Sequence, residues 1–350
     1  MDISFEFVNY GENLVPQPDT IVLDVGMKTV PGVVDHHHPE AEPECTASLI
    51  IKYPRLVLDH LKIRLEKETV QGPAGLRVVT HRLPDFDALS SIFLALKLLE
   101  LGKVDASMEK IAGYARMADS ASLPRDIDLT ATPYSILRAL FSGAKKDESE
   151  INRERITEGL KFMKFLYAKA EEGYDILENR RLFAGIDRYE RAIRKVEDDY
   201  FHYLDDFRKA QKVSLDLPLA AGQGRKKVDG LVVRNPSSFL LKEWARRDIG
   251  RAPLAEGFSF LMTNFGNRRY ILGVDPARGI NLKGLGSLLN RKEEEKKAGP
   301  GMAFSFRWYE GNCPFFNYRI IDSPQDGTLL SHEDIVQILL DFSWEVNQPA

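Results

Sequence analysis

The spacing of hydrophobic and polar positions changes repeatedly along the first part of the chain, and each change predicts an element. Short apolar runs predict buried strands at 20–26, 32–35 and 76–80. Apolar residues three and four apart predict one helix over 46–65, interrupted near Pro54, and another that starts near Leu89 and ends at Gly102. A turn is expected at 71–75. Strands that alternate with helices in this order are typical of a parallel sheet covered by helices.

The second part of the chain has a different pattern. Residues 148–213 have helical spacing, with acidic and basic residues four apart, which usually marks a solvated helix face. After residue 214, strands are expected at 228–233, 258–263 and 269–274, and helices at 237–247 and 282–297. We therefore expect an α/β protein of three parts: a parallel-sheet domain over 1–147, a helical linker over 148–213, and a second, smaller α/β domain over 214–350.

Composition narrows the class of protein. A length of 350 residues exceeds one typical domain. The 43% hydrophobic and 29% charged residues are the composition of a soluble globular protein. A net charge of -4 and a pI near 6.1 argue against a broad phosphate-binding surface, so long nucleic acid is not the favoured partner.

Cysteine usage and hydropathy give the expected compartment. Cys45 and Cys313 are far apart and form no CxxC, so we expect neither a disulfide framework nor a cysteine–zinc site. No stretch reaches the ~18 apolar residues that span a bilayer. The first ten residues lack the basic and apolar regions of a signal peptide. We therefore expect a cytoplasmic protein without membrane association.

The densest group of chemically useful residues follows the run at 32–35. An acidic residue, Asp35, is followed by histidines at 36–38, and these are three of the seven histidines in the chain. Neutral imidazole binds Mn, Fe, Co, Ni, Cu and Zn, whereas carboxylate favours harder cations. The mixture predicts a divalent ion of the Mn or Co kind, and a histidine-rich surface loop is the alternative.

Further acidic residues stand where the predicted strands end. Asp24 closes the first run, the position from which a buried parallel strand presents a side chain to a ligand; a strand-end turn is the alternative. The third run is followed by H-x3-D-x-D, formed by His81, Asp85 and Asp87. Asp85 and Asp87 could each address a different ion. Asp87 could instead cap the next helix, but that would leave His81 and Asp85 unexplained.

A last acidic candidate lies in the helix-like stretch 111–123. Asp119 stands near the end of this stretch, and Asp126 and Asp128 follow shortly after it. Taken alone, each of the three is typical of a cap or turn residue. We keep Asp119 as the candidate ligand, with Asp126 or Asp128 as alternatives.

Together these motifs resemble the four motifs of the DHH phosphoesterase superfamily, a group of manganese-dependent phosphohydrolases. Its members include manganese pyrophosphatases and exopolyphosphatases, single-strand exonucleases, and hydrolases of short oligonucleotides and cyclic dinucleotides. The resemblance covers roughly the first 130 residues. It implies a DHH-like catalytic domain with a DHH-associated-like substrate domain after the linker, and two bound divalent ions. Mn²⁺ is the expected metal, with Co²⁺ or Mg²⁺ as alternatives.

The resemblance also implies a role for each residue of the motifs. The implied ligands are His81 and Asp85 for one ion, and His36, Asp87 and Asp119 for the other. Asp24 would bridge both ions and His37 would contact the substrate phosphate, so these two are the expected catalytic residues. Asp35 would not bind an ion itself but would orient an imidazole by a hydrogen bond.

The chain departs from the family pattern in two ways. H-x3-D-x-D usually comes first in the family, whereas here it follows Asp-His-His, so the motif order is permuted and the strand order stays open. The second domain has no Gly-Gly-Gly-His, the family motif that grips substrate. In its place, the candidates for holding outer phosphates are Arg268, Arg269, Lys283 and Arg291. A plain charged surface is the alternative for these four residues.

The expected function is that of a dinuclear metal-dependent hydrolase. A metal-activated water would cleave a phosphodiester or phosphoanhydride bond of a small phosphorylated or nucleotide substrate. One alternative is a regulatory module that binds a nucleotide or polyphosphate with little turnover. Another is a single-strand exonuclease. The partner is expected to be a small anionic phosphate compound, with a short oligonucleotide left open, and the choice between monomer and homodimer also stays open.

Overall fold

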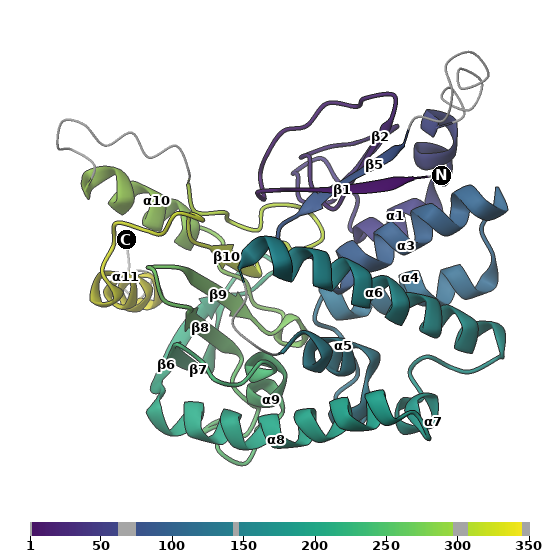
Figure 1. Cartoon of the computed structure of the whole chain (residues 1–350). Coiled ribbons are helices and arrows are strands. Elements are labelled where there is room, and N and C mark those ends of the chain that lie inside the picture. Colours follow the sequence, from purple (N-terminus) through teal and green to yellow (C-terminus); the bar gives the residue numbers. More distant parts are fainter. Residues whose placement is uncertain (1, 62–74, 143–146, 297–306, 345–350) are drawn as a thin grey trace. The chain divides into compact units, whose positions relative to one another are not determined.

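The computed structural model describes residues 2–61, 75–142, 147–296 and 307–344 (Figure 1). The chain divides into two compact units. The first unit comprises Met1–Val196 and Cys313–Phe315, and the second comprises Glu197–Asn312 and Phe316–Ala350. Three parts of the expected elements lie outside the described residues: 62–65 of the first helix, 71–74 of the turn, and Lys297 at the end of the last helix.

The division between the units falls inside α8 (Asp187–Lys209), in the stretch that we expected to be a linker. In the first unit, α6 (Glu148–Glu171) packs against α3 (Phe86–Leu101) and α4 (Ala106–Asp119). The observed division therefore differs from the boundaries expected at 147 and 213. The boundary at 147 is absent because α6 buries apolar side chains such as Phe162 against the first unit, under a charged outer face.

The first unit contains a five-stranded sheet that is mostly parallel. Its strands, in spatial order, are β1 (Ile3–Val8), β5 (Leu76–His81), β2 (Thr20–Leu23), β4 (Val33–Val34) and β3 (Thr29–Val30). β1, β5, β2 and β4 run parallel, and β3 pairs antiparallel with β4. β2 is completely buried, whereas the edge strand β1 is partly exposed along its length. A buried parallel strand is apolar on both faces, which is why the run at 20–23 does not alternate.

Helices accompany this sheet, and their bounds follow local signals. In addition to α3, α4 and α6, the unit has α1 (Thr46–Lys52), α5 (Pro133–Phe141), α7 (Asn179–Phe183) and a helical stretch at 55–61. The break after α1 falls at Pro54, as the sequence predicts. α3 begins after Asp85, whose side chain accepts hydrogen bonds from two backbone amides, and ends at Gly102 with a φ of 68°. The helix cap is thus Asp85, and the alternative of a cap at Asp87 is wrong.

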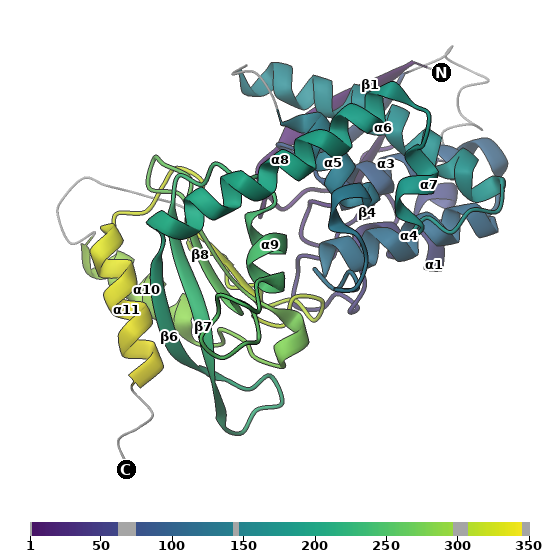
Figure 2. The same cartoon turned by 90° about the horizontal axis from the view of Figure 1, so that it is seen from below.

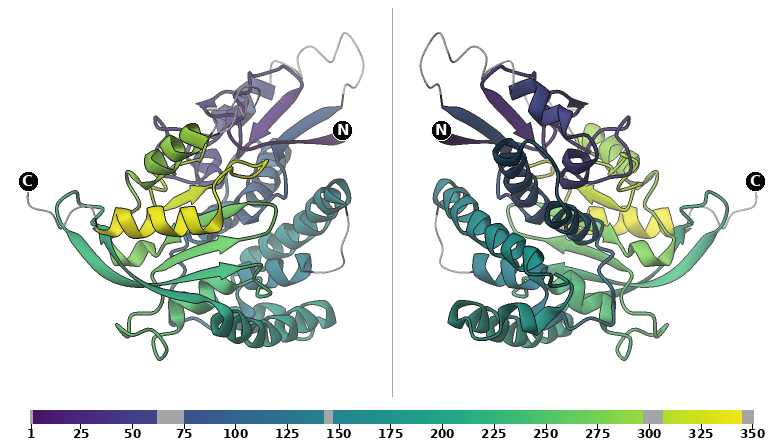
Figure 3. Two further views of the ribbon diagram at one scale, coloured as in Figure 1. Left: turned by 90° about the vertical axis from the view of Figure 1, so that its left-hand side faces the viewer. Right: turned by 90° about the vertical axis from the view of Figure 1, so that its right-hand side faces the viewer.

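The second unit is built on a mixed sheet with two covered faces. Its strands, in spatial order, are β10 (Ile320–Asp322), β9 (Tyr270–Val274), β8 (Phe260–Asn264), β7 (Arg225–Arg234) and β6 (Gln211–Pro218). Only β7 and β8 pair in parallel. Val232 packs with α10 (Leu285–Lys296) and α11 (His332–Trp344), whereas Leu231 and Val233 pack with α9 (Leu241–Arg247) and the end of α8. This alternation along β7 places one helical layer on each face of the sheet (Figures 2 and 3).

The two units together establish a mixed α/β protein with a parallel-rich sheet in the first unit, and the sequence prediction is confirmed at this level. Within the described ranges, every helix is too short or too polar to cross a bilayer.

Candidate metal centre

The candidate residues of the first unit gather where its parallel strands end. Asp24 follows β2, residues 35–37 follow β4, and His81 is the last residue of β5. Parallel strands present their carboxyl ends at one edge of a sheet, so side chains distant in sequence meet there. Asp24 has a φ of 62°, a left-handed conformation that Asp tolerates better than most residues and that turns the chain sharply after the strand.

One group of possible ligands consists of Asp24, His81 and Asp85. Their ligand atoms all lie within 4.8 Å of one another. His81 Nε2 is 3.3 Å from Asp24 Oδ2 and 3.9 Å from Asp85 Oδ1. His81 Nδ1 is 2.9 Å from the carbonyl oxygen of Arg82, which fixes the ring with Nε2 directed at the carboxylates. The side chain of Asp85 is 47% exposed, so solvent reaches this group from that side.

A second group consists of His36, Asp87 and Asp119, again with ligand atoms within 4.8 Å of one another. His36 Nε2 is 3.4 Å from Asp119 Oδ2, and His36 Nδ1 is 3.9 Å from Asp87 Oδ2. The carboxylate of Asp87 accepts hydrogen bonds from the backbone amides of Thr46 at 2.9 Å and Ala47 at 3.1 Å. The first turn of α1 therefore sets the orientation of Asp87.

Asp24 lies between the two groups. Its Oδ2 faces His81, and its Oδ1 is 3.3 Å from His36 Nδ1. Its Oδ1 also accepts a hydrogen bond from Thr46 Oγ1 at 2.9 Å. The two oxygens of this one buried carboxylate are thus directed at different groups, as a bridging ligand requires.

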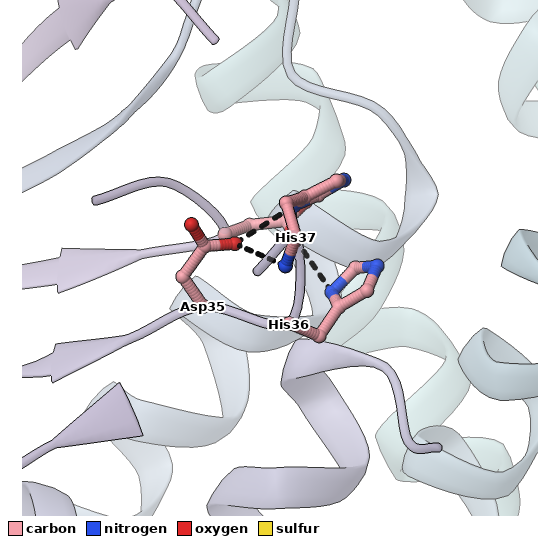
Figure 4. Close-up of side chains that lie close together, drawn as sticks. Asp35, His36 and His37 are labelled. Atoms are coloured by element: carbon pink, nitrogen blue, oxygen red, sulfur yellow. Dashed lines mark hydrogen bonds and ion pairs between the residues drawn. The ribbon is translucent and has the colours of Figure 1, made fainter. Parts of the chain in front are cut away.

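Asp35 holds His37 next to His36 (Figure 4). Its Oδ1 is 2.7 Å from His37 Nδ1 and accepts the backbone amide of His37 at 3.1 Å. Its Oδ2 accepts the backbone amide of Met27 at 2.6 Å. Asp24, Asp35, His36 and His37 form a third set with ligand atoms within 4.8 Å. Because both oxygens of Asp35 already accept hydrogen bonds, orienting His37 is the role that this geometry favours.

The crowding of charges shifts the pKa values of the carboxylates. Burial, followed by the charges of Asp24 and Asp119, raises the pKa of Asp87 well above its ordinary value. Burial opposes ionisation of Asp24 as well, but hydrogen bonds with His36 and His81 outweigh it and hold the pKa of Asp24 well below its usual range. Carboxylates buried this close together repel one another. A divalent cation among them would relieve that repulsion, so the donor set fits metal ions.

The histidines respond to the same surroundings in opposite directions. Burial, followed by the charge of His37, lowers the pKa of His36, which favours the neutral imidazole that a metal ligand requires. Burial also disfavours a charged His37, but the carboxylate of Asp35 outweighs it, and the pKa of His37 is raised well above its ordinary value. The surroundings therefore favour the neutral form of His36 and the protonated form of His37.

Three residues at the centre carry no motif that the sequence made visible. Thr46 Oγ1 contacts both Asp24 and His36, and its hydroxyl is completely buried among them. The hydroxyl of Tyr10 is 3.1 Å from His81 Nε2, and its ring stacks on His81. Phe315, which belongs to the first unit, places its ring edge-on to His36 at 4.9 Å between centroids. The local signals in the sequence are the start of a helix at Thr46 and the aromatic pair Phe315-Phe316, which is typical of core or of a stacking surface.

The alternatives to Asp119 have other roles. Asp128 accepts hydrogen bonds from Thr130 and pairs with Arg180 at 3.0 Å, so it caps the short helix η1 (Leu129–Ala131). Asp126 is exposed. The structure therefore brings Asp119 to the two groups and leaves Asp126 and Asp128 outside them.

The four candidate cations of the second unit stand in different parts of its chain. Arg268, Arg269, Lys283 and Arg291 are all exposed. Arg268 and Arg269 immediately precede β9, Lys283 follows the short helix η2 (Pro276–Arg278), and Arg291 lies on α10. Their expected contact with outer phosphates stays a prediction.

Comparison of the chain with protein-family models, with curated proteins and with solved structures gave no match. The function is therefore inferred from the residues and geometry of the centre.

Proposed function

We propose that the chain is a dinuclear metal-dependent phosphohydrolase of the DHH type, which cleaves a phosphodiester or phosphoanhydride bond in a small substrate. The observation that carries this proposal is the pair of three-residue groups at one sheet edge, with the two oxygens of Asp24 directed at different groups. Separations of 3.3–3.9 Å between ligand atoms of neighbouring residues suit a small cation between them.

The chemistry of the donor set supports two divalent ions. Each group combines imidazole nitrogen with carboxylate oxygen, the mixture that suits Mn²⁺ or Co²⁺. Asp24, Asp85, Asp87 and Asp119 carry the charge that balances two such ions, and the imidazoles of His36 and His81 would add none when they bind the ions. This balance favours two ions over one.

The chain's own residues would divide the work of hydrolysis. When bound, the ions would lower the pKa of a water molecule and draw charge from the phosphoryl oxygens. Asp24 would fix the position of one group relative to the other, because each of its two oxygens faces a different group. His37, kept cationic by Asp35, would donate a hydrogen bond to a phosphoryl oxygen as negative charge develops there. The exposed side of Asp85 is the side from which substrate would enter.

The resemblance to DHH phosphoesterases supports the same proposal, including the permuted order of motifs. β5, which ends at His81, pairs with β2, which Asp24 follows, although a longer stretch of chain separates these strands than separates β2 from β4. A strand, its loop and its helix can therefore come later in the chain and still present H-x3-D-x-D beside the other motifs. The DHH-type assignment rests on this placement and on the motif residues.

Metal analysis together with a substrate panel tests the proposal. Protein treated with chelator and then with MnCl₂ should retain two Mn²⁺ per chain. It should release phosphate or nucleotide from at least one of pyrophosphate, polyphosphate, cyclic dinucleotides and short oligonucleotides. A protein that retains no Mn²⁺ would rule out the proposal.

A regulatory binding module is the second candidate function. It is favoured by the absence from the sequence of the glycine-rich histidine motif with which larger DHH proteins grip substrate. A chain that retains Mn²⁺ and binds one of these phosphates without turning it over would establish the binding module in place of the enzyme. Stepwise shortening of a single-stranded oligonucleotide, with no action on the smaller compounds, would indicate an exonuclease.

A further inference from the structure

The loop between β5 and α3, residues 82–85, places Asp85 beside His81 in an uncommon backbone conformation. Leu83 has a φ of 56°, in the left-handed region that a bulky side chain rarely adopts. Leu83 also precedes Pro84, and a residue before proline normally prefers extended backbone. Such a conformation persists only where surrounding contacts hold it.

Two side chains of α6 supply these contacts. Asn152 Oδ1 accepts a hydrogen bond from the backbone amide of Leu83 at 2.6 Å. Arg155 Nη1 donates to the carbonyl oxygen of Leu83 at 2.7 Å and approaches that of Pro84 at 3.4 Å. Side chains of α6 therefore bind both the amide and the carbonyl of Leu83. The two residues, Asn152 and Arg155, are three apart and lie on the same face of the helix.

The setting of Asn152 and Arg155 is not that of a solvated helix surface. Asn152 is 3% exposed, and the guanidinium of Arg155 lies 5.2 Å from the centre of the Phe141 ring. Burial and the nearby charge of Arg138 lower the pKa of Arg155 to about 10, against the favourable charge of Asp85. Arg155 thus stays a cation at neutral pH. The charge pattern of 148–213 predicts a solvated face for its acidic and basic residues, and Arg155, which is only partly exposed, departs from it.

Apolar contacts hold α6 against α3 independently of this polar pair. At Gly159 the two helices approach so closely that an added Cβ would lie 2.6 Å from Leu89 Cδ1. Phe162 and Met163 are completely buried on the same helix. The hydrogen bonds to Leu83 are therefore not required to pack α6, and they act on the loop.

We infer that Asn152 and Arg155 are positioning residues that hold Asp85 in place for the group Asp24–His81–Asp85, acting through the backbone of Leu83. The inference rests on the proposed function, because it assigns a task to residues behind a metal ligand. Removing either contact lets Leu83 relax toward extended backbone and moves Asp85 away from His81. The other group, His36–Asp87–Asp119, is linked to this loop through the backbone amide of Asp87, which donates to Asp85 Oδ1 at 3.0 Å. The carboxylate of Asp87 is held separately by the first turn of α1, so this group should lose less affinity.

Titration of the chelator-treated full chain with MnCl₂, followed by calorimetry, tests the inference. Asp85→Asn and Asp119→Asn serve as references that show which binding step belongs to which group. Arg155→Met and Asn152→Ala should each weaken the step that Asp85→Asn weakens, by about 10–100-fold, and weaken the other step much less. Arg153→Met is the matched control, because Arg153 is exposed on the same helix, and it should bind both ions as the parent does.

A conservative variant and the Tm distinguish a positioning role from a role in the stability of the whole fold. Arg155→Lys keeps a charge and one donor for the carbonyl of Leu83, so it should recover part of the lost affinity. Unchanged affinity for both ions in Arg155→Met and Asn152→Ala would overturn the inference. Equal weakening of both steps with a lowered Tm would overturn it as well. If Arg155→Met does not fold, Asn152→Ala decides by the same criteria.

The parent protein distinguishes this inference from the proposed function. A parent that binds two Mn²⁺, together with variants that match it, overturns the positioning role alone. A parent that binds no Mn²⁺ overturns the proposed function and the positioning role with it.

Discussion

Thr46 Oγ1 donates a hydrogen bond to Asp24 Oδ1 across 2.9 Å, at the point where the carboxylate faces both candidate groups. The same hydroxyl oxygen lies 3.1 Å from His36 Nδ1. The other ring nitrogen of His36, Nε2, is 3.4 Å from Asp119 Oδ2. One hydroxyl thus contacts both the shared carboxylate and the imidazole beside it and helps to orient them.

Thr46→Val should weaken Mn²⁺ binding and lower kcat/KM, each by about tenfold or more, because the substitution keeps the shape of the side chain and removes only the hydroxyl. Thr46→Ser is the matched control and should stay close to the parent. Calorimetry with MnCl₂ and turnover of the best substrate give the two measurements. Parent-like values for Thr46→Val would show that the hydroxyl has no part in the site.

Asp24→Asn should reduce activity by orders of magnitude and weaken retention of the second ion. The amide keeps the size of the side chain but removes the negative charge that both groups share. Metal content by elemental analysis and phosphate release measure the two effects. Asp126→Asn is a matched control, since Asp126 is exposed and lies outside both groups. Retention of two ions and full rate in Asp24→Asn would contradict the dinuclear mechanism.

His37→Ala should lower kcat while leaving the metal content nearly intact. The imidazole of His37 is held by Asp35 and is proposed to meet the phosphate, so its loss removes stabilisation of the transition state. His36→Ala provides the contrast, because it should release metal. If His37→Ala lost metal to the same extent as His36→Ala, His37 would be a ligand.

The ion pair of Asp35 and His37 gives a pH dependence with a defined sign in chelator-treated protein. Because the pKa of His37 is raised well above its ordinary 6.5, the imidazolium stabilises the fold fully below 6.5, and this contribution is lost as pH rises through the raised pKa. Asp35→Asn should lower the pKa of His37 and remove this part of the dependence. Imidazole ¹⁵N NMR titration and thermal unfolding on the alkaline side of neutrality measure it. An unchanged His37 pKa in Asp35→Asn would refute the pairing.

Charge reversal at the exposed cations of the second unit should weaken substrate binding. Arg269 immediately precedes β9, and Lys283 follows the short helix η2 (Pro276–Arg278). Because an anionic substrate needs its outer charge held, Arg269→Glu or Lys283→Glu should raise KM by about tenfold with kcat nearly unchanged. Steady-state kinetics on the best substrate decide, and an unchanged KM for both variants would remove these cations from the substrate site.

The sequence alone determined which strands end in chemically active residues. Runs of buried β-branched residues predict parallel strands from composition and length, and β2, β4 and β5 lie where these runs predict them. An acidic or histidine residue directly after such a run is expected at the carboxyl edge of the sheet, whatever the strand order. That is why Asp24, His36 and His81 could be named before their distances were known.

Only the tertiary structure decided which residues support that centre. Thr46, Tyr10, Asn152 and Arg155 act through contacts with elements distant in sequence, and hydropathy patterns record burial of a face but not the identity of its neighbours. Asp85 and Asp87 show the same limit, since both are acidic residues near a helix start, and only the folded backbone made Asp85 the cap and turned Asp87 toward α1. The position of a side chain along its element is local information, whereas its partner depends on how sheet and helices pack.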